Sequence, residues 1–555
     1  MLDIGVIKGV ISKIPYIKKV ISLKKDEFFI YGKIEILFEG LEKPLSFKFQ
    51  IFPKYPLKSY DSESIRFINK DLLKYNHVMK DGSICIHTSY NTNIRKKLLI
   101  DFNSLKSWIE KYYINNDEDK KYEHIIVSPS LIHNKYYSYI FTDVDYKFKK
   151  GDYGEVKLSL LANGIYKEAN IANYLVKSFS TQNGEKTECY WNKMYKKNPL
   201  TDNGFYVFIE KHPAEYNKFA FKKFNKLETY IPSAFLDLLH KFEKYNLKNS
   251  KDIIVPMFIG YTTVESEIHW QVALLEIGNF PIKEEYEKKD KILVPIRKLT
   301  DQDIKWAITR NASYKYFFGR GTLVTKITNA KILVIGVGAI GSMIAKVLVK
   351  GGCRFVDIAD YDIKEPENIC RSEYLFNTGI TDKVYELQQI LLTNSPFVEI
   401  NIFKKEYFEE IIKIFSTDLR DREHFASKLN EYDIIFDCTT DNDLMYVLNL
   451  LELNCDLINL SITNHAKELV CAFSPNIDHF VNTQFEKLLD NDIDDLYEPI
   501  GCWSPTFKAS YADISVLVQM AMKQINLIYE KNKARNNFII RTEDDNVFTV
   551  RIEEY

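Results

Sequence analysis

Hydrophobic positions on the C-terminal side of the chain follow the pattern of a buried parallel sheet. Short apolar runs at residues 331–335, 355–359 and 434–436 are typical of strands that are covered on both faces. A helical pattern over residues 342–350 separates the first two runs. Because strands and helices alternate here, we predict a Rossmann-like α/β domain in which crossover helices connect parallel strands.

The N-terminal side shows a strand pattern followed by one helix. Residues 28–38 and 45–52 are rich in β-branched and aromatic side chains and predict two strands. Residues 101–113 predict an amphipathic helix, because their large apolar side chains share one face: Leu105, Trp108, Ile109 and Tyr112. This order predicts a small α+β domain.

The middle of the chain mixes short predicted strands with one helical segment, residues 234–245. The strand-like segments are 155–161, 204–209, 253–261 and 270–276. A charged run at residues 115–122 marks the first boundary, and no chemical motif stands out in this region. We therefore predict a multidomain α/β protein with a mixed linker domain in the middle and boundaries at 1–115, 116–300 and 301–555.

Composition favours a soluble globular protein over a nucleic-acid-binding, membrane-spanning or secreted one. The chain has 555 residues, of which 46% are hydrophobic and 27% charged, as in ordinary soluble globular proteins. A formal net charge of -1 argues against direct nucleic-acid binding, which needs a basic surface. No apolar run reaches the ~18 residues of a membrane helix, and residues 1–19 lack the order of a secretory signal. We expect a cytoplasmic protein whose eight scattered cysteines are free thiols.

A glycine-rich loop follows the first buried strand. The sequence GVGAIG places Gly336, Gly338 and Gly341 between that strand and the predicted helix. Such glycines allow a tight turn, and the free N–H groups of the helix start can bind phosphate. Asp360 lies 19 residues beyond Gly341, where an acid that binds ribose is expected. The loop alone is compatible with a dinucleotide enzyme.

Charged residues beyond the loop favour a different nucleotide. Two or three acids, an arginine and a lysine suit a triphosphate with magnesium, because the cations hold phosphate oxygens and an acid ligates the metal. A nicotinamide cofactor does not need this much charge. The residues are Asp360, Asp362, Asn368, Arg371, Lys383 and, in the FDCTTDN segment, Asp441.

In this order the motifs resemble those of the ThiF/MoeB/ubiquitin-activating enzyme superfamily, over about residues 306–522. The resemblance implies ATP-dependent adenylation of a carboxyl terminus. It assigns ribose binding to Asp360, Mg²⁺ binding to Asp441 and phosphate contacts to Asn368, Arg371 and Lys383. The glutamine that usually follows the arginine is Ser372 here.

The same resemblance implies a homodimer. In that family an arginine ahead of the glycine loop often reaches the partner's nucleotide site. Arg310 fits this role best and is assigned a catalytic part, with Arg320 as the second candidate.

Thioester-forming members of the superfamily carry a cysteine beyond the nucleotide site, and Cys502 is the candidate here. It lies in IGCWSPTF, just before a helical pattern at residues 509–528. A helix start can lower a thiol pKa and favour the thiolate. The alternative is a structural cysteine packed beside Trp503.

A second candidate cysteine lies in the N-terminal region. A strand meander, the FPKYP turn, His77 and GSICIH with Cys85 follow one another as in the ubiquitin-conjugating fold, over roughly residues 27–113. That resemblance implies that Cys85 accepts a thioester. The family's HPN tripeptide is replaced at 77–79, so its oxyanion donor must come from elsewhere. The candidates are Asn76, His87 and Asn93.

Together the two resemblances imply consecutive steps of one reaction. A protein substrate with a flexible C-terminus is adenylated with ATP and Mg²⁺, transferred to Cys502, passed to Cys85 and conjugated to a target amine. The fused layout resembles activating–conjugating proteins of bacterial anti-phage (CBASS) operons, whose substrate is a cyclic-oligonucleotide synthase. Three alternatives stay open: a sulfur-carrier adenylyltransferase, an NAD-dependent oxidoreductase and a non-catalytic conjugating-like scaffold.

Overall fold

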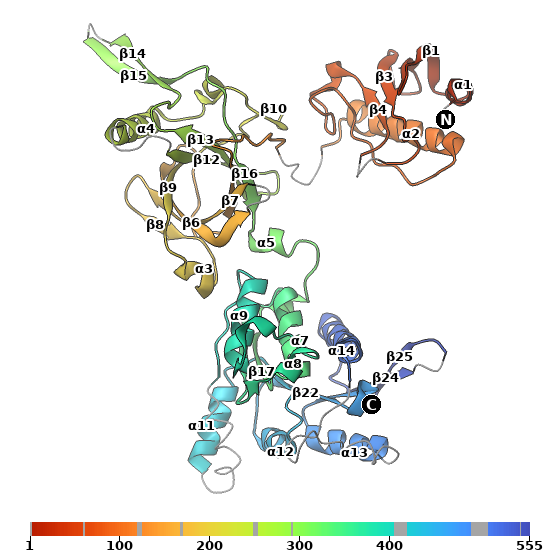
Figure 1. Ribbon diagram of the computed structural model, residues 1–555, viewed down its shortest axis with the longest axis vertical. Helices are drawn as coiled ribbons and strands as arrows, with labels where there is room; N and C mark the ends of the chain where they lie inside the picture. Colours follow the sequence, from red (N-terminus) through yellow and green to blue (C-terminus); the bar gives the residue numbers. More distant parts are fainter. Residues whose placement is uncertain are drawn as a thin grey trace. The chain divides into compact units, whose positions relative to one another are not determined.

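The chain packs into two compact units. The computed structural model describes residues 3–58, 62–118, 125–166, 170–247, 253–289, 292–403, 419–489, 509–543 and 546–555. The first unit comprises Met1–Tyr139, Tyr146–Lys186 and Asp202–Arg310, and the second comprises Ile140–Asp145, Thr187–Thr201 and Asn311–Tyr555. Figure 1 colours the chain along its sequence. Within the described ranges, every helix is too short or too polar to span a bilayer.

The N-terminal part of the first unit is an antiparallel meander packed on helices. Its sheet has the order β1-β2-β3-β4, formed by Ile17–Lys25, Ile30–Ile36, Leu45–Ile51 and Ile65–Ile68. Helices α1 (Ile4–Ile11) and α2 (Ile94–Trp108) cover one side, and a π-helical turn, η2 (Ile109–Ile114), continues α2. A short 3-10 turn, η1, spans Lys70–Leu72. Strands β2 and β3 confirm both predicted strands, whereas α1 and β1 were not predicted.

Helix α2 begins at Ile94 and not at Asp101, so the predicted start was wrong. Asn93 caps the helix, because its side-chain oxygen accepts a hydrogen bond from the Lys96 N–H at 3.1 Å. The first turns carry charged side chains, which the hydrophobic pattern counts as solvent-exposed. Lys97 and Asp101 are in fact buried, so the core-facing stripe runs farther toward the N-terminus than the apolar residues indicate.

The rest of the first unit is built around an eight-stranded sheet. Its order is β13-β12-β9-β6-β7-β5-β16, with β8 paired to β7. The strands are β5 (Tyr136–Phe141), β6 (Tyr153–Tyr166), β7 (Ile171–Thr181), β8 (Lys186–Glu188), β9 (Asp202–Phe208), β12 (Ile254–Thr262), β13 (Ile268–Glu276) and β16 (Ile308–Asn311). The predicted strands and the predicted helix of this region correspond to β6, β9, β12, β13 and α4 (Ser233–Asn246).

Smaller elements complete this region. Two hairpins pair β10 (Ala214–Glu215) with β11 (Phe219–Ala220) and β14 (Ile282–Lys289) with β15 (Ile292–Leu299). Helix α3 (Lys193–Lys197) belongs to the second unit by its contacts, and a 3-10 turn, η3, spans Phe224–Leu227.

The second unit contains a seven-stranded mixed sheet in the order β18-β17-β21-β22-β23-β24-β25. The strands are β17 (Lys331–Ile335), β18 (Phe355–Ala359), β21 (Ile434–Asp437), β22 (Asp456–Ile462), β23 (Glu468–Phe473), β24 (Phe538–Glu543) and β25 (Thr549–Glu554). The three predicted strands, β17, β18 and β21, pair in parallel together with β22, which was not predicted. The last three strands pair antiparallel. The predicted parallel sheet is therefore only one part of a larger mixed sheet.

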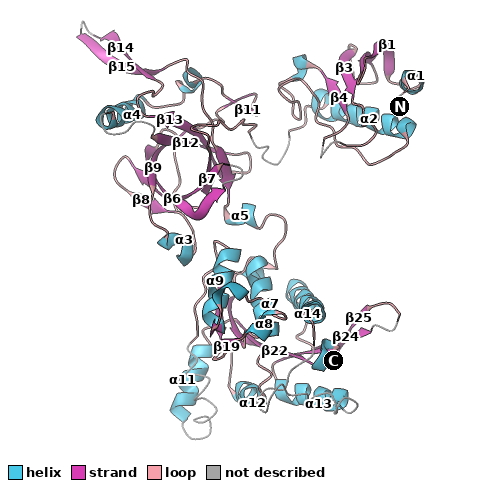
Figure 2. Ribbon diagram, in the orientation of Figure 1, coloured by secondary structure: helices cyan, strands magenta, loops and turns pink. Residues whose placement is uncertain are grey.

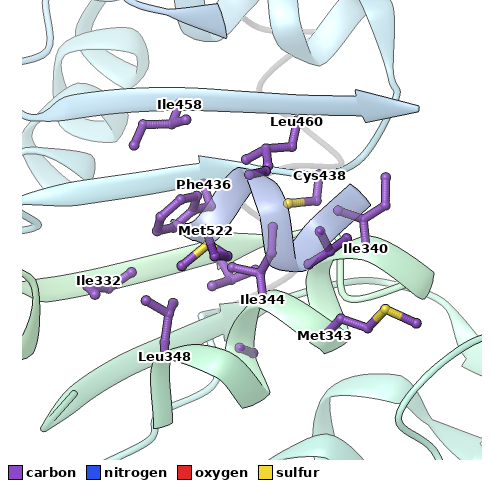
Figure 3. Close-up of a cluster of buried hydrophobic side chains, with 14 of the residues drawn as sticks. Ile332, Ile340, Met343, Ile344, Leu348, Phe436, Cys438, Ile458, Leu460 and Met522 are labelled. Carbon is purple, nitrogen blue, oxygen red and sulfur yellow. The ribbon is translucent and has the colours of Figure 1, made fainter. Parts of the chain in front are cut away.

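Helices cover both faces of this sheet (Figure 2). Helices α7 (Ala339–Lys350), α9 (Lys383–Asn394) and α14 (Tyr511–Lys531) share one core, and α11 (Leu419–Leu429), α12 (Asn442–Leu450) and α13 (Ile477–Leu489) share the other. Successive residues of β17 face opposite layers: Ile332 packs in the first core and Leu333 in the second. Figure 3 shows Ile332, Ile344, Phe436 and Met522 meeting in the first core. Burial on both faces explains the continuous apolar runs of the sequence.

Short elements follow strands β18 and β22 at their carboxyl ends, namely β19 (Ile363–Lys364), α8 (Pro366–Ile369), η4 (Phe376–Thr378), β20 (Thr381–Asp382) and η5 (Asn464–Ala466). Two short helices, α5 (Tyr314–Phe317) and α6 (Thr325–Thr328), precede β17. Strands β19 and β20 pair with each other.

Candidate functional site

The glycine loop leaves the carboxyl end of β17 and enters α7. Gly336 has a φ of 77°, and a Cβ there would lie 2.9 Å from the Thr439 backbone. A Cβ on Gly341 would lie 1.9 Å from the Gly336 carbonyl oxygen. Gly338, the N-cap residue of α7, faces open space. Two glycines are thus required by packing within the protein, whereas the surroundings of Gly338 leave room for a ligand.

We expect alanine at 341 and at 338 to have different effects on stability. Gly341→Ala forces the loop and α7 apart and is expected to cost about 1–3 kcal/mol, as overpacking does. Gly338→Ala meets no neighbouring atom and is expected to cost less than about 1 kcal/mol. Hydrogen exchange of the α7 amides in the two variants measures the difference. Equal protection of α7 in both would contradict the packing argument.

Asp360 ties the end of β18 to the glycine loop. Its Oδ2 accepts a hydrogen bond from the Val337 N–H at 2.7 Å, and its Oδ1 accepts one from the Asp362 N–H at 2.9 Å. Burial raises the pKa of this carboxyl above its usual value, although the two N–H donors and the Lys383 ammonium act in the opposite direction. Asp360 therefore shapes the loop, and its role toward a ribose stays a prediction.

The structure brings Asp362 and Lys383 together with Asp360. The Lys383 ammonium forms an ion pair with the Asp362 carboxylate, and the Lys383 N–H donates to the Asp362 carbonyl at 3.1 Å. Pairing of β19 with β20 places the two residues side by side. Lys383 is buried and starts α9, so its ammonium is held beside the loop by a carboxylate that an incoming phosphate could replace.

The segment after β19 is a compact turn that carries Asn368 and Arg371. Asn368 Oδ1 accepts a hydrogen bond from the Glu365 N–H at 2.9 Å and completes a capping box around α8. The Ser372 hydroxyl, where the superfamily usually has glutamine, donates to the Asn368 carbonyl at 2.5 Å. Ser372 thus closes this turn within the protein, and Arg371 lies inside the turn.

Sequence reasoning did not single out a buried lysine in β19, Lys364. Lys364 is 1% exposed, and its ammonium donates to the Leu375 carbonyl at 2.7 Å and to the Glu386 carboxylate at 2.5 Å. Glu386 also accepts from the Leu375 N–H at 2.8 Å. These bonds lower the pKa of Glu386, outweighing the effect of burial, which raises it. The pair anchors the loop between β19 and α9 that carries Arg371.

Asp441 is the N-cap residue of α12. Its Oδ1 accepts hydrogen bonds from the Asp443 N–H at 2.9 Å and the Leu444 N–H at 3.0 Å. Groups of three or more metal-binding side chains do not occur among the described residues. Magnesium bound to a nucleotide needs only one or two protein carboxylates, because phosphates and water supply the other ligands. Asp441 therefore fits such a site, with Oδ2 as the oxygen that is not used in the cap.

A second acid lies behind Asp441, and sequence reasoning did not single it out. Asp437 is 2% exposed and accepts hydrogen bonds from the Thr439 hydroxyl at 2.7 Å and from the Asn459 amide at 2.9 Å. Burial raises its pKa. Because Thr439 contacts Gly336, Asp437 supports the glycine loop from below. The sequence signal for Asp437 is its position as the last residue of the apolar strand β21.

The remaining predicted residues of the nucleotide site lie elsewhere or are not described. Arg310 is an exposed residue of β16 and belongs to the first unit, and its NH1 donates to the Thr309 carbonyl at 2.8 Å. Arg320 is exposed and belongs to the second unit. Cys502 lies outside the described residues. The roles of all three stay predictions.

The other cysteines of the second unit differ from one another in exposure. Cys353, Cys438 and Cys471 are buried, and burial raises the pKa of each thiol, as expected for structural cysteines. Burial also raises the pKa of Cys455 to about 11. Cys370 is exposed, and its thiol lies 3.3 Å from the Glu367 carbonyl oxygen.

Cys85 is half-buried in the first unit and lies beside an imidazole. Its Sγ is 3.7 Å from His87 Nε2. His87 is exposed to solvent on its other side. Of the other predicted oxyanion donors, Asn93 caps α2, and the Asn76 carbonyl accepts a hydrogen bond from the Trp108 indole at 3.1 Å. His87 is thus the candidate whose side chain the structure places against Cys85.

A buried ionic network supports the segment after His87. Thr88 donates its N–H to Glu63 at 3.0 Å, and its hydroxyl accepts a hydrogen bond from Lys97 Nζ at 2.5 Å. Lys97 also forms ion pairs with Glu63, at 3.1 Å, and with Asp101. The Tyr55 hydroxyl donates to Asp101 at 2.8 Å. Helix α2 therefore holds the Cys85 segment through buried charged side chains.

Comparison with known proteins identifies the second unit's domain type. Residues 309–458 match the ThiF family. The chain is 27% identical over 236 residues to the ATP-dependent ubiquitin transferase-like protein Cap2 of Enterobacter hormaechei subsp. hoffmannii (strain UCI 50), covering 41% of this chain and 37% of Cap2. It is 25% identical over 189 residues to the adenylyltransferase and sulfurtransferase UBA4 of Candida glabrata, covering 33% of this chain and 38% of UBA4.

The chain spans less than two fifths of the length of these two curated relatives. Among solved structures, Escherichia coli MccB crystallised with ATP matches at 14% identity and a TM-score of 0.29, covering 41% of this chain and 64% of MccB. The family match confirms the predicted resemblance to the ThiF/MoeB/ubiquitin-activating superfamily for this part of the chain.

Proposed function

We propose, from the premise that residues 309–458 form a ThiF family domain, that the protein is an ATP-dependent enzyme that activates and conjugates a protein C-terminus. The observation that carries this proposal is the site at the strand ends of the second unit. There a glycine loop open at Gly338 adjoins the Asp362–Lys383 ion pair and the cap residue Asp441. Such a site suits a nucleotide triphosphate better than a dinucleotide.

Each group of the site has a part in adenylation. The N–H groups at the start of α7 bind phosphate, and Asp360 binds ribose. Arg371 and Lys383 neutralise the triphosphate, while Asn368 holds the turn in place. Mg²⁺, held by Asp441 and phosphate oxygens, would polarise the phosphoryl groups. Arg310 would complete the site from the partner in a homodimer.

The reaction then proceeds by acyl transfer. The substrate's terminal carboxylate attacks the α-phosphorus of ATP and forms an acyl adenylate, and pyrophosphate leaves. The Cys502 thiolate attacks the acyl carbon, and AMP leaves with the bonding electrons. The Cys85 thiolate attacks the Cys502 thioester and releases the Cys502 thiolate. A target amine finally attacks the Cys85 thioester, and the amine proton passes to a base as an amide forms.

The N-terminal part of the first unit supports the last two steps. Its four-stranded meander, the following turn with Cys85 and the helix α2 have the order expected of a ubiquitin-conjugating fold. His87 lies where it can take the thiol proton and keep Cys85 as a thiolate. Tethering both activities on one chain raises their effective concentration to the mM range for a linker of suitable length.

The substrate is a protein with a flexible C-terminus. The similarity to Cap2, whose name describes an ATP-dependent ubiquitin transferase-like protein, supports conjugation over a purely metabolic role. We assign the protein to bacterial anti-phage defence, with a cyclic-oligonucleotide synthase as the conjugated substrate. UBA4, named as both adenylyltransferase and sulfurtransferase, supports the alternative of sulfur-carrier activation, which would need neither Cys85 nor its surroundings.

The relay is tested with ATP, Mg²⁺ and a peptide that carries the C-terminus of a candidate substrate. Wild type, Cys85→Ala and Cys502→Ala are examined on non-reducing gels, and the adduct is located by mass spectrometry. We expect a thiol-sensitive adduct on both cysteines in the wild type. In Cys85→Ala the adduct should remain on Cys502, whereas in Cys502→Ala it should be absent from both, because the acyl group passes through Cys502 first.

The matched control is Cys370→Ala, which removes an exposed thiol of the second unit that the relay does not use. AMP formation without an adduct on either cysteine would replace the relay with the sulfur-carrier alternative. Bound NAD without AMP formation would support an oxidoreductase instead.

A further inference from the structure

The turn that carries Cys85 is shaped by its backbone. The Cys85 N–H donates to the His77 carbonyl at 2.7 Å, and Val78 pairs with Ile84 in an antiparallel bridge. His77 has a φ of 59°, and its ring lies 4.8 Å from the Tyr112 ring. The position of Cys85 therefore depends on residues 73–78 keeping one conformation.

A lysine from the middle of the chain binds this same segment. Lys218 Nζ donates to the carbonyl oxygens of Leu73 at 3.0 Å, Tyr75 at 2.5 Å and Val78 at 3.1 Å. Lys218 is only 4% exposed. An ammonium group has three N–H donors, so three converging carbonyls match it in number. Burial of a charge is costly unless such bonds compensate it, and charge-assisted bonds are stronger than neutral ones.

Lys218 is presented by a tightly held hairpin. It follows the two turn residues between β10 and β11, Tyr216 and Asn217, whose φ values are 53° and 57°. Its N–H donates to the Glu215 carbonyl at 3.1 Å, and its carbonyl accepts from the Ile126 N–H at 2.6 Å. Backbone bonds on both sides of the residue fix the direction from which the side chain approaches. The ammonium therefore binds residues 73–78 from a pre-organised position.

We propose that Lys218 is a positioning residue for Cys85. Its ammonium gathers three carbonyls of residues 73–78, this segment fixes the Cys85 backbone through His77, and the thiol is thereby held in one place for acyl transfer. The importance of this position rests on the proposed function, in which Cys85 accepts the thioester. The middle region, for which the sequence offered no chemical motif, then contributes directly to the conjugating step.

The first readout is hydrogen exchange of the turn in the full chain. In Lys218→Met, a side chain of similar length without donors, we expect the Cys85 and Ile84 amides to exchange about tenfold faster, because three carbonyls, one of them in a buried hydrogen bond, lose the Lys218 ammonium. Lys218→Arg keeps the charge and the donors and should restore most of the protection. Lys226→Met, an exposed lysine of the same region, is the matched control and should match wild type.

The second readout is the single-turnover rate of transfer from Cys502 to Cys85. We expect Lys218→Met to form the Cys502 thioester at the wild-type rate and to transfer it about tenfold more slowly, because a displaced nucleophile loses its alignment. Lys218→Arg should recover most of the transfer rate. If Lys218 were only structural, Lys218→Met would lower the rates of both thioester formation and transfer, or neither rate.

The outcomes separate this proposal from the proposed function. Unchanged exchange of the Cys85 and Ile84 amides in Lys218→Met overturns the positioning role, and so does faster exchange with an unchanged rate of transfer. A wild type that forms no adduct on Cys85 counts against the proposed function, and the exchange data then decide alone whether Lys218 holds the turn. If Lys218→Met does not fold, Lys218→Gln, whose shorter amide reaches fewer carbonyls, carries the same comparison.

Discussion

Asp441→Asn is expected to lower ATP–pyrophosphate exchange by at least about a hundredfold while leaving the fold intact. An asparagine oxygen can still accept the bonds from the Asp443 and Leu444 N–H groups, so the cap of α12 survives. The negative charge that would bind Mg²⁺ is lost, and a metal contributes several kcal/mol to the stabilisation of phosphoryl charge. Pyrophosphate exchange with a candidate C-terminal peptide measures the effect.

Two further variants separate the effect of the Asp441 helix cap on stability from the effect of its negative charge on exchange. Asp441→Ala removes both and should also lower the stability of the second unit by about 1 kcal/mol, the usual cost of a lost cap. Asp443→Asn makes the same charge change on the exposed neighbour in the first turn of α12 and should leave exchange nearly unchanged. If Asp443→Asn lowers exchange as much as Asp441→Asn does, the assignment of the metal ligand is wrong.

Asp101→Leu is expected to destabilise the N-terminal part of the first unit by about 3–5 kcal/mol. Asp101 is fully buried and pairs with Lys97, which is 1% exposed. Removing one partner of a buried ion pair is the costly case, because the Lys97 ammonium then keeps only Glu63, at 3.1 Å, as a carboxylate partner. The Tyr55 hydroxyl loses its acceptor at the same time. Hydrogen exchange of the α2 amides reports the loss, because these amides open with the local core.

An ion pair between α2 and its continuation η2 provides the control. Lys106 and Glu110 form a half-exposed ion pair at 3.2 Å, and Glu110→Gln should cost at most about 0.5 kcal/mol. The double variant Lys97→Met with Asp101→Leu should recover most of the stability, because neither charge then remains buried alone. A double variant as unstable as Asp101→Leu would show that the network contributes through shape and not through charge.

Thr88 connects the buried ionic network around Lys97 to the candidate cysteine, Cys85. Lys97 and Glu63 bind the Thr88 hydroxyl and N–H, and Thr88 follows His87, whose ring contacts Cys85. Lys218 fixes the other side of the same segment through residues 73–78. Two buried lysines from distant parts of the chain therefore hold the thiol and its neighbouring imidazole.

The nucleotide-site half of the second unit could be predicted closely from sequence. Strands β17 and β18 have the predicted bounds, and the glycine loop lies between β17 and α7 as expected. The reason is that these features are local: an apolar run covered on both faces has no polar alternation, and Gly336 is required by its own positive φ. The charged residues Asp360, Asp362 and Lys383 also meet: the two acids follow the carboxyl end of β18, and the pairing of β19 with β20 brings Lys383 beside them.

Other features depended on partners far away in sequence. Sequence patterns treat a charged side chain as solvent-facing, so Lys97, Lys364 and Lys218 carried no signal, although each is at most 4% exposed. A buried ammonium is stable only where carbonyls and carboxylates converge on it, and that convergence exists only once the chain has folded. Local periodicity and glycine geometry thus account for the sheet and its loop, while the buried charges that hold the two candidate sites follow from long-range packing.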